Sequence, residues 1–376
     1  MIEPATRDAC AAAPAVAAGR GSPVALTLRV TPRARFDAID ITARVRAETD
    51  DALAPFPRVL YCSRHTTAGF LEQGVANRLA RRQERVDAFF RTYRGLFPEG
   101  ADYQHDRLEL RQELSPEQRR VEPRNADSHL AFIGAGLRSC VTYANRAGQP
   151  VHLIDLDGVS GGVPRIRHTL VVGYGSEEVV HRERWEVPVS RHPIDSVNLA
   201  DPAVGLLGRI DELVRREGVT HGRVDIALGD GEQDAAVTVN EYETLLMRHD
   251  LAEVLRDPLK FLLRQGKRML ADPAAIPAKT LGYARYDVVQ VVKGVIDAFG
   301  LSDSLVERLL ARAMALPAAR LLRLKRAVSL AVLGAGDAPA VVRGTYQSPI
   351  LLQWSAPSRG CRSLLITLKR FRGYLV

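Results

Sequence analysis

Three histidines lie in segments whose patterns give no local reason for a histidine. His65 follows an apolar run typical of a buried strand, His105 lies in a polar stretch, and His129 stands at the start of a helical pattern. Histidine exchanges protons near neutral pH and is the commonest metal ligand in proteins. If the three converge, they would form an acid–base site. With a carboxylate such as Asp106 or Glu241, they would also suit a divalent ion such as Zn or Mg.

Other polar residues near these histidines are candidates for binding an anion. Thr66 and Thr67 offer hydroxyls and backbone donors to a phosphate, although threonine is also a common strand residue. Arg165 and Arg167 are two apart in a strand pattern and so share a face, where they form either a phosphate fork or a solvated charged surface. Asn125 binds a ligand or caps the helix that follows it. The remaining histidines are interpreted as surface or core residues: His152, His168, His181, His192, His221 and His249.

The elements that must position these residues follow one order twice. In the first half the predicted elements are strand 24–30, helix 40–53, strand 58–70, helix 76–97, helix 128–137 and strands 149–158 and 165–175. In the second half they are strand 185–190, helix 205–218, strands 222–230 and 235–241, a helical region from 242 to about 334, and strands 348–354 and 361–371. These assignments rest on apolar periodicity. A period of about 170 residues indicates an internal repeat.

Three motifs carry a family resemblance. They are HTTA at 65–68, YQHD at 103–106 and NADSHL at 125–130, and they occur in one order at plausible spacings. Together they resemble the YjbQ-like family, of the secondary thiamine-phosphate synthase type. The family pattern has a glutamate nine residues after the first histidine and an aspartate nine residues further on. This sequence has Gly74 and Gln83 there.

The second half supplies what the first lacks. The strand AAVTVNEY matches the family's N-E strand with Asn240 and Glu241, Asp250 follows nine residues later, and GTYQ matches the family's GTWQ with Gln347. Counting nine residues back from Glu241 reaches Glu232, where the family histidine has been lost. The two halves therefore retain complementary residues, as expected if they share a single composite site.

The resemblance implies an α+β fold with two YjbQ-like domains, each a mixed curved β-sheet packed with helices. The predicted division is a disordered tail at 1–22, a first domain at 23–183 and a degenerate second domain at 184–376 with a helical insertion at about 258–321. The implied catalytic residues are His65, His105, Asp106, His129, Glu241 and Asp250, and His65, His105 and His129 are the implied metal ligands. The implied ligand-binding residues are Thr66, Thr67, Tyr103, Asn125, Gln149, Arg165, Arg167, Asn240 and Gln347.

Composition narrows the class of protein. The net charge is +8, but the arginines are spread along the chain without a basic block, which favours a small anionic substrate over nucleic acid. The four cysteines form no CxxC pair, which argues against a zinc ribbon or a disulfide framework. With no signal-peptide order and no run of 18 apolar residues, we expect no membrane association and a cytoplasmic location. The resemblance also implies a homo-oligomer.

The function expected from these features is an enzyme acting on a small phosphorylated or anionic substrate at a composite site of histidines and acids. By resemblance the reaction is a thiamine-phosphate-synthase-like transfer, which joins a pyrimidine pyrophosphate to a thiazole phosphate. A hydrolase or lyase of a specialised pathway is an alternative. A non-catalytic ligand-binding or scaffold protein is another.

Overall fold

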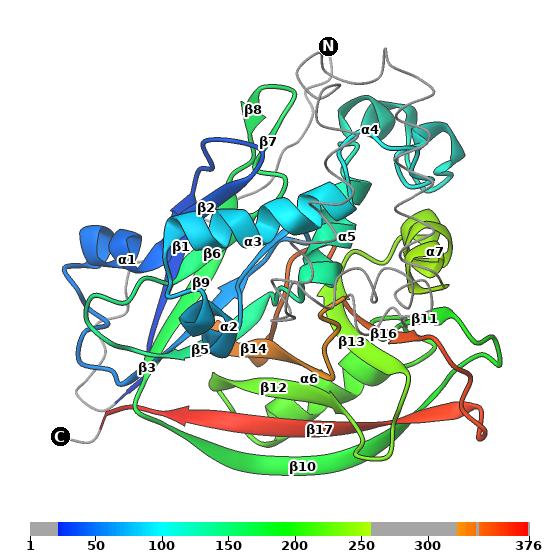
Figure 1. Ribbon diagram of the computed structural model, residues 1–376. Helices are drawn as coiled ribbons and strands as arrows, with labels where there is room; N and C mark the ends of the chain where they lie inside the picture. Colours follow the sequence, from blue (N-terminus) through cyan, green and yellow to red (C-terminus); the bar gives the residue numbers. More distant parts are fainter. Residues whose placement is uncertain (1–21, 257–321, 336–337, 375–376) are drawn as a thin grey trace, which may run out of the picture.

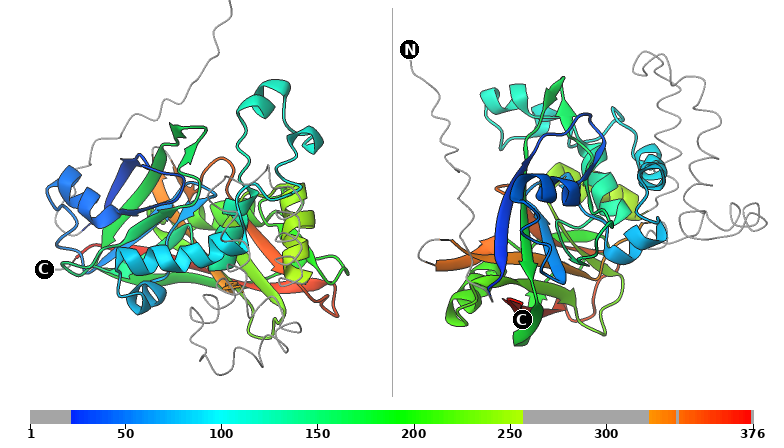
Figure 2. Two further views of the ribbon diagram at one scale, coloured as in Figure 1. Left: turned by 45° about the horizontal axis from the view of Figure 1, so that its top comes forward. Right: turned by 90° about the vertical axis from the view of Figure 1, so that its left-hand side faces the viewer.

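The computed structural model describes residues 22–256, 322–335 and 338–374, and these form an α+β fold with antiparallel sheets (Figures 1 and 2). The predicted α+β class is confirmed. The predicted insertion at 258–321 and nearly all of the predicted tail at 1–22 lie outside the described residues. In the part of the chain that the structure describes, no helix has the length and apolarity needed to cross a membrane.

The first half contains nine strands and several short helices. They are β1 (Val24–Val30), β2 (Asp37–Asp40), α1 (Ile41–Thr49), β3 (Arg58–Ser63), β4 (Ala68–Gly69), α2 (Gln73–Arg78), α3 (Gln83–Leu96), η1 (Leu108–Leu110), α4 (Pro116–Val121), α5 (Ala126–Ala135), β5 (Cys140–Ala144), β6 (His152–Asp155), β7 (Val159–Ser160), β8 (Val163–Pro164) and β9 (Arg167–Tyr174).

The second half continues directly from β9. Its described elements are β10 (Ser176–Pro188), β11 (Asp195–Asn198), α6 (Leu206–Arg216), β12 (His221–Leu228), β13 (Ala235–Asn240), η2 (Leu246–Asp250), α7 (Leu251–Arg256), β14 (Ala327–Ala335), β15 (Ala338–Val342), β16 (Ser348–Gln353) and β17 (Cys361–Arg372). The predicted domain boundary between residues 183 and 184 falls inside β10, which pairs with β17 along nearly its whole length.

The two halves have the same strand order. The main sheet of the first half runs β1-β9-β3-β5, and that of the second half runs β10-β17-β12-β14 with β15 added at the edge. In both main sheets, the first strand of the half pairs with the last strand of that half. Two strands from the middle of the half's sequence then follow in the sheet. The small sheets correspond in the same way, as β2-β6-β4 and β11-β16-β13.

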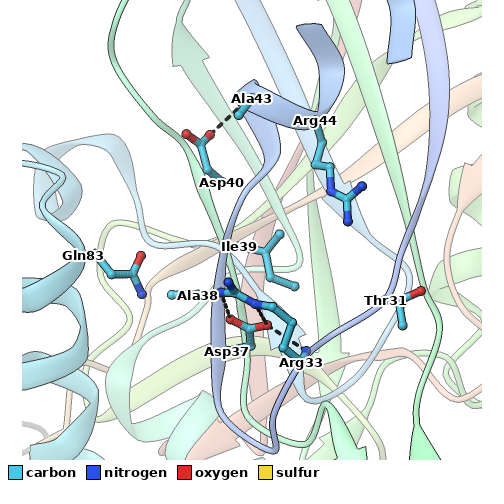
Figure 3. A pocket seen from close by; sticks show the side chains of 9 residues that line it. All are labelled: Thr31, Arg33, Asp37, Ala38, Ile39, Asp40, Ala43, Arg44 and Gln83. Carbon is cyan, nitrogen blue, oxygen red and sulfur yellow. Dashed lines mark hydrogen bonds and ion pairs between the residues drawn. The ribbon is translucent and has the colours of Figure 1, made fainter. Parts of the chain in front are cut away.

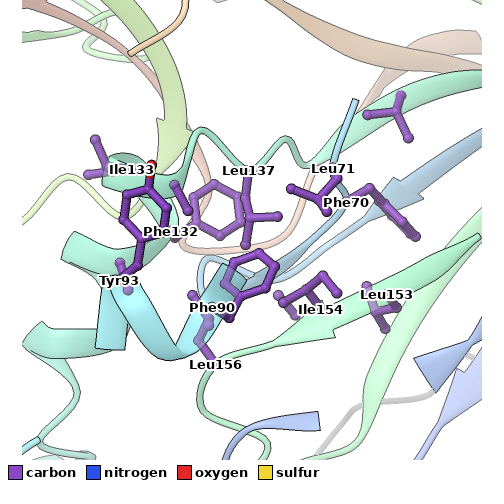
Figure 4. Packing of buried hydrophobic residues seen from close by; sticks show 14 of the residues in the cluster. Phe70, Leu71, Phe90, Tyr93, Phe132, Ile133, Leu137, Leu153, Ile154 and Leu156 are labelled. Atoms are coloured by element: carbon purple, nitrogen blue, oxygen red, sulfur yellow. The ribbon is translucent and has the colours of Figure 1, made fainter. Parts of the chain in front are cut away.

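Apolar packing joins the halves. In the larger hydrophobic core, α3 and α5 pack side chains such as Phe90 and Phe132 onto the sheet residues Leu153 and Ile154 (Figure 4). The helix α3 presents its apolar residues at i, i+3, i+4 and i+7, which forms one buried stripe. The same core includes Leu251 of α7, so the first half's helices and this part of the second half share one interior.

Two helix predictions are wrong. The predicted helix at 76–97 is broken after α2, because Ala80 and Arg81 adopt left-handed backbone angles, with φ of 52° and 53°. The predicted helical region ending near 334 contains β14, which pairs with β12 on one side and β15 on the other. A central strand that is buried on both faces shows the same continuous apolar run as a buried helix, so periodicity does not separate the two.

Candidate functional site

His129 and Asn240 meet where α5 of the first half reaches the end of β13 of the second. His129 Nδ1 lies 2.6 Å from Asn240 Oδ1, and the Asn240 amide nitrogen donates to the Thr66 carbonyl at 3.1 Å. The donation to Thr66 fixes which end of the amide is the oxygen. It follows that His129 carries its proton on Nδ1 and has a lone pair on Nε2.

The Nε2 side of His129 faces an acid of the second half. Glu241 Oε2 lies 3.6 Å from His129 Nε2, and Arg111 lies 3.5 Å from the other oxygen of Glu241. Burial, followed by the charge of His105, lowers the pKa of His129 to about 3. Burial raises the pKa of Glu241, although His105 and Arg111 oppose the rise. His129 is therefore a neutral imidazole across the physiological range.

His105 has a different set of partners. Its Nδ1 lies 2.9 Å from Glu243 Oε2, and its Nε2 lies 3.4 Å from Asn125 Oδ1. The Asn125 nitrogen donates to Asp157 at 2.7 Å, so the oxygen of Asn125 faces the histidine. Both ring nitrogens of His105 thus face acceptors, an arrangement that favours the imidazolium form.

The electrostatics of His105 agree with this geometry. Burial lowers the pKa of His105, but the hydrogen bond to Glu243 and the charge of Glu241 outweigh burial and raise it overall. Burial likewise raises the pKa of Glu243, but its hydrogen bond with His105 and those from two backbone amides lower it overall. The rings of His105 and His129 lie 5.4 Å apart and nearly perpendicular, so two imidazoles whose pKa values are shifted in opposite directions are direct neighbours.

Asp106 and Asp250 hold backbone around this pair. Asp250 accepts the N–H groups of Gln104 and His105, each at 2.9 Å, and burial raises its pKa to about 6. Asp106 accepts the first N–H of α5 from Ala126 at 3.0 Å. The side chain that caps α5 is therefore Asp106, while the predicted cap Asn125 uses its amide to bridge His105 and Asp157.

His65 makes a different contact. Its Nε2 accepts the backbone N–H of His168 at 2.8 Å, and the two rings stack with centroids 6.2 Å apart. The second half reaches this segment through Gln347, whose amide donates to the carbonyls of Ser63 and His65 at 3.0 and 2.9 Å. The structure thus places His105 and His129 together, and joins His65 to the same junction through its backbone.

The donor set does not fit the predicted metal centre. Both ring nitrogens of His105 and Nδ1 of His129 already have protein partners, and His65 Nε2 accepts a backbone N–H. Over residues 22–256, 322–335 and 338–374, no group of three or more His, Cys, Asp or Glu side chains is arranged to hold a metal ion.

The two predicted phosphate-binding arginines are paired with acids. Arg167 is buried and donates to both oxygens of Asp155 at 2.6 and 2.8 Å and to the carbonyl of Asp157 at 2.6 Å. Arg165 forms an ion pair with the buried carboxylate of Asp157. A fork for phosphate needs unpaired guanidinium groups, so these two arginines position the loop instead.

The remaining predicted ligand-binding residues lie at different places around the site. The hydroxyl of Tyr103 donates to the Pro98 carbonyl at 3.0 Å, and the carbonyl of Thr67, a buried residue, accepts the N–H of Leu156 at 3.1 Å. Gln149 lies in the turn before β6, at the opposite end of that strand from Asp157.

Gln83, which stands where the family has an acid, lines a separate cavity of about 510 Å³ (Figure 3). That cavity lies along β2, where Arg33 and Asp37 form an ion pair at 2.8 Å. No residue of the predicted site lines it.

Sequence reasoning missed Glu243 and Arg111. Glu243 is the direct partner of His105, and it stands two residues after Glu241 in the same NEYE segment. A search for further acids in that segment would have found it. Arg111 lies in a polar stretch among many arginines, and its position beside Glu241 leaves no signal in the sequence.

Comparison with known proteins gives structural neighbours only. No protein-family model matches the sequence, and no curated protein matches it either. Among solved structures, the chain is similar to a YbjQ-like protein of unknown function from Sulfolobus solfataricus P2, at 16% identity and a TM-score of 0.28 over 52% of this chain and 99% of that one.

A hypothetical protein from Aeropyrum pernix K1 gives 15% identity and a TM-score of 0.26, over 52% of this chain and 100% of that one. An uncharacterized conserved protein of the yjbq family from Clostridium acetobutylicum gives 13% identity and a TM-score of 0.25, over 50% and 98%. The Clostridium protein thus belongs to the family that the sequence motifs resemble.

Proposed function

We propose that this chain is an enzyme that performs acid–base chemistry on a small anionic substrate at the junction of its two halves. The observation that carries the proposal is a buried pair of imidazoles whose surroundings raise the pKa of one and lower that of the other. His129 offers a lone pair on Nε2, and His105 holds a proton on Nε2. A base and an acid kept side by side, with pKa values driven apart by their surroundings, is the arrangement that general acid–base catalysis needs.

Each histidine has a distinct part in this proposal. His129 accepts a proton from the reacting group, while Asn240 holds its ring in the required tautomer and Glu241 stabilises the cation that forms. His105 donates a proton to the leaving group or stabilises negative charge that develops there. Its hydrogen bond to Asn125, at 3.4 Å, is long enough to be exchanged for one to substrate. Glu243 keeps His105 charged until that step.

The site is composite because the halves are, we infer, diverged copies of one fold. His65 Nε2 accepts the backbone N–H of His168 on β9 at 2.8 Å, and Glu232 Oε1 accepts the N–H of Ser363 on β17 at 2.8 Å. The loops that carry His65 and Glu232 both follow the third strand of their half, β3 and β12. Glu232 therefore occupies in the second half the place that His65 has in the first.

Each half also has a buried arginine with equivalent hydrogen-bond partners. Arg167 donates to the carboxylate of Asp155, the last residue of β6, and to the backbone carbonyl two residues further on. Arg362 donates to the amide oxygen of Gln353, the last residue of β16, and also to the carbonyl two residues further on. The shared strand order and these paired contacts support a duplication in which each half has lost what the other supplies.

The class of reaction follows from the resemblance. A thiamine-phosphate-synthase-like transfer needs stabilisation of a departing pyrophosphate and removal of a proton, and the His105–His129 pair offers an acid and a base for these steps. A hydrolase or lyase would use the same pair on a different anionic substrate. One observation favours a non-catalytic scaffold, namely that buried hydrogen bonds already satisfy both nitrogens of His105.

Turnover by variants tests the proposal. The purified chain would be assayed against a pyrimidine pyrophosphate with a thiazole phosphate, and against a panel of phosphate esters. His129→Gln and His105→Gln should each lower turnover by about 10²-fold or more, the usual effect of losing an acid–base group. His152→Gln, on β6 outside the site, is the control and should keep turnover. The proposal is wrong if the parent chain turns over none of these substrates, or if His129→Gln and His105→Gln are as active as the parent. Either result would favour a non-catalytic scaffold.

A further inference from the structure

A basic and aromatic surface lies where the two halves meet beside His65. We define the junction patch as Arg64 and His168 of the first half with Arg343 and Tyr346 of the second. His168 and Arg343 are exposed, Arg64 is half-buried, and the Tyr346 side chain is 70% exposed. The Tyr346 ring is therefore open to a ligand, and it stands three residues after Arg343.

Backbone contacts bring the two sides of this patch together. The N–H of Arg64 donates to the carbonyl of His168 at 3.2 Å. On the other side, the turn that carries Tyr346 lies directly on Arg64, since a Cβ built on Gly344 would come within 1.8 Å of the Arg64 carbonyl oxygen. The guanidinium of Arg343 donates to the Gln347 carbonyl at 3.5 Å.

The cations of the junction patch are available, unlike the arginines behind them. Arg165 and Arg167 are neutralised by Asp157 and Asp155. Within the described ranges neither Arg64 nor Arg343 has a carboxylate within ion-pair distance. Burial first, and then neighbouring charges that include Arg167 and Arg64, lower the pKa of His65 to about 3. Unpaired positive charge at this junction attracts anions.

The junction patch is also linked to the acid–base pair. His65 leads directly to Thr66, whose carbonyl accepts the amide of Asn240, and Asn240 in turn holds His129 at 2.6 Å. An anionic group bound at the patch would therefore sit beside the pair rather than on a remote surface. The hydroxyl of Thr66, which is half-buried at the same place, is a further donor to such a group.

We propose that the junction patch binds the phosphate or pyrophosphate group of the substrate between Arg64 and Arg343, with a planar ring of the substrate against Tyr346. This inference rests on the proposed function and names the substrate class of that site as a ring-bearing phosphate. Because the two arginines come from different halves, binding requires both copies even though neither arginine touches the histidine pair.

Calorimetric titration of the full chain with pyrophosphate tests the inference. Arg64→Ala and Arg343→Ala should each weaken binding by about 10-fold, the scale of one lost charge-assisted hydrogen bond, and the double variant by more than either alone. The matched controls are Arg184→Ala and Arg359→Ala, arginines that line a separate cavity of about 500 Å³ in the second half. Both controls should bind like the parent chain. Tyr346→Ala should weaken phenyl phosphate more than inorganic phosphate.

Several results would overturn this inference. They are the absence of measurable pyrophosphate binding by the parent chain, equal losses in the control and test variants, and malonate binding as tightly as pyrophosphate. His129→Gln separates this inference from the proposed function. That variant should bind pyrophosphate like the parent chain while losing turnover. If turnover fails to depend on His129 but the arginine variants lose pyrophosphate, the proposed function falls and the anion site remains.

Discussion

Removing the negative charge of Glu243 should destabilise the protein in a pH-dependent way. The carboxylate lies 2.9 Å from His105 Nδ1, and the side chains of Glu243 and His105 are 6% and 1% exposed. Glu243 also accepts the N–H groups of Leu245 and Leu246 at 2.7 and 2.8 Å. Glu243→Gln removes the negative charge of the carboxylate and replaces one of its two acceptor oxygens with an NH2 donor. Breaking a buried ion pair in this way costs about 3–5 kcal/mol.

The pH dependence follows from the direction of the pKa shift of His105. Its folded-state pKa is raised above the ordinary value of 6.5, so the stabilisation from the pair is fully present below about pH 6.5 and is lost as the pH rises through the folded pKa. Glu243 has a lowered pKa and is therefore ionised at pH 5.5. The cost of Glu243→Gln should thus be about 3 kcal/mol at pH 5.5 and clearly smaller at pH 9.

Urea unfolding at pH 5.5 and pH 9, followed by circular dichroism, measures this difference. The matched control is Glu113→Gln, because Glu113 also pairs with a buried cation, Arg111 at 2.7 Å, but is itself 53% exposed. An exposed partner contributes at most about 1 kcal/mol. The reasoning is refuted if Glu243→Gln costs no more than the control, or if its cost is the same at both pH values.

Three further substitutions test the junction between the halves and the residues that support it. Gly344→Ala should disrupt the junction and lower the unfolding midpoint, because its Cβ would meet the Arg64 carbonyl oxygen at 1.8 Å, whereas Gly231→Ala, with nothing within 4 Å, should not. Arg362→Ala should destabilise the chain by about 3 kcal/mol in urea unfolding, since it leaves the buried amide oxygen of Gln353 and the part-buried carbonyls of Gln233 and Ser355 without their donor. Asn240→Ala removes the three hydrogen bonds that the amide makes and should lower the thermal midpoint together with turnover; an unchanged midpoint would contradict its bridging role.

Much of the framework could be predicted from the sequence. Alternation predicted the strand that became β1, and the apolar stripe of 205–218 predicted α6, because these elements bury one face and expose the other. The strand that became β13 was also predicted from alternation, although the structure buries both of its faces. The motifs also led to His105 and His129, and the matched strand led to Asn240 and Glu241, which contact His129 in the structure.

What failed depended on contacts between distant segments. Arg165 and Arg167 do lie side by side, but their availability for phosphate depends on Asp155 and Asp157, whose positions come only with the folded loop. His65 was expected beside the other histidines, whereas its ring is held by the backbone of His168 on the neighbouring strand. No pattern local to one segment reports such partners.

The central claim is that the second half sets His105 charged and His129 neutral, and nitrogen-15 NMR of the labelled imidazoles tests it most directly. At pH 7 we expect His105 to show two protonated nitrogens. We expect His129 to show one proton, on Nδ1, with a signal that does not titrate between pH 5 and 8, in keeping with a pKa lowered by burial to about 3. In Glu243→Gln, His105 should become neutral at pH 7. If instead the two histidines titrate together near pH 6.5, or His129 carries its proton on Nε2, the acid–base assignment is contradicted.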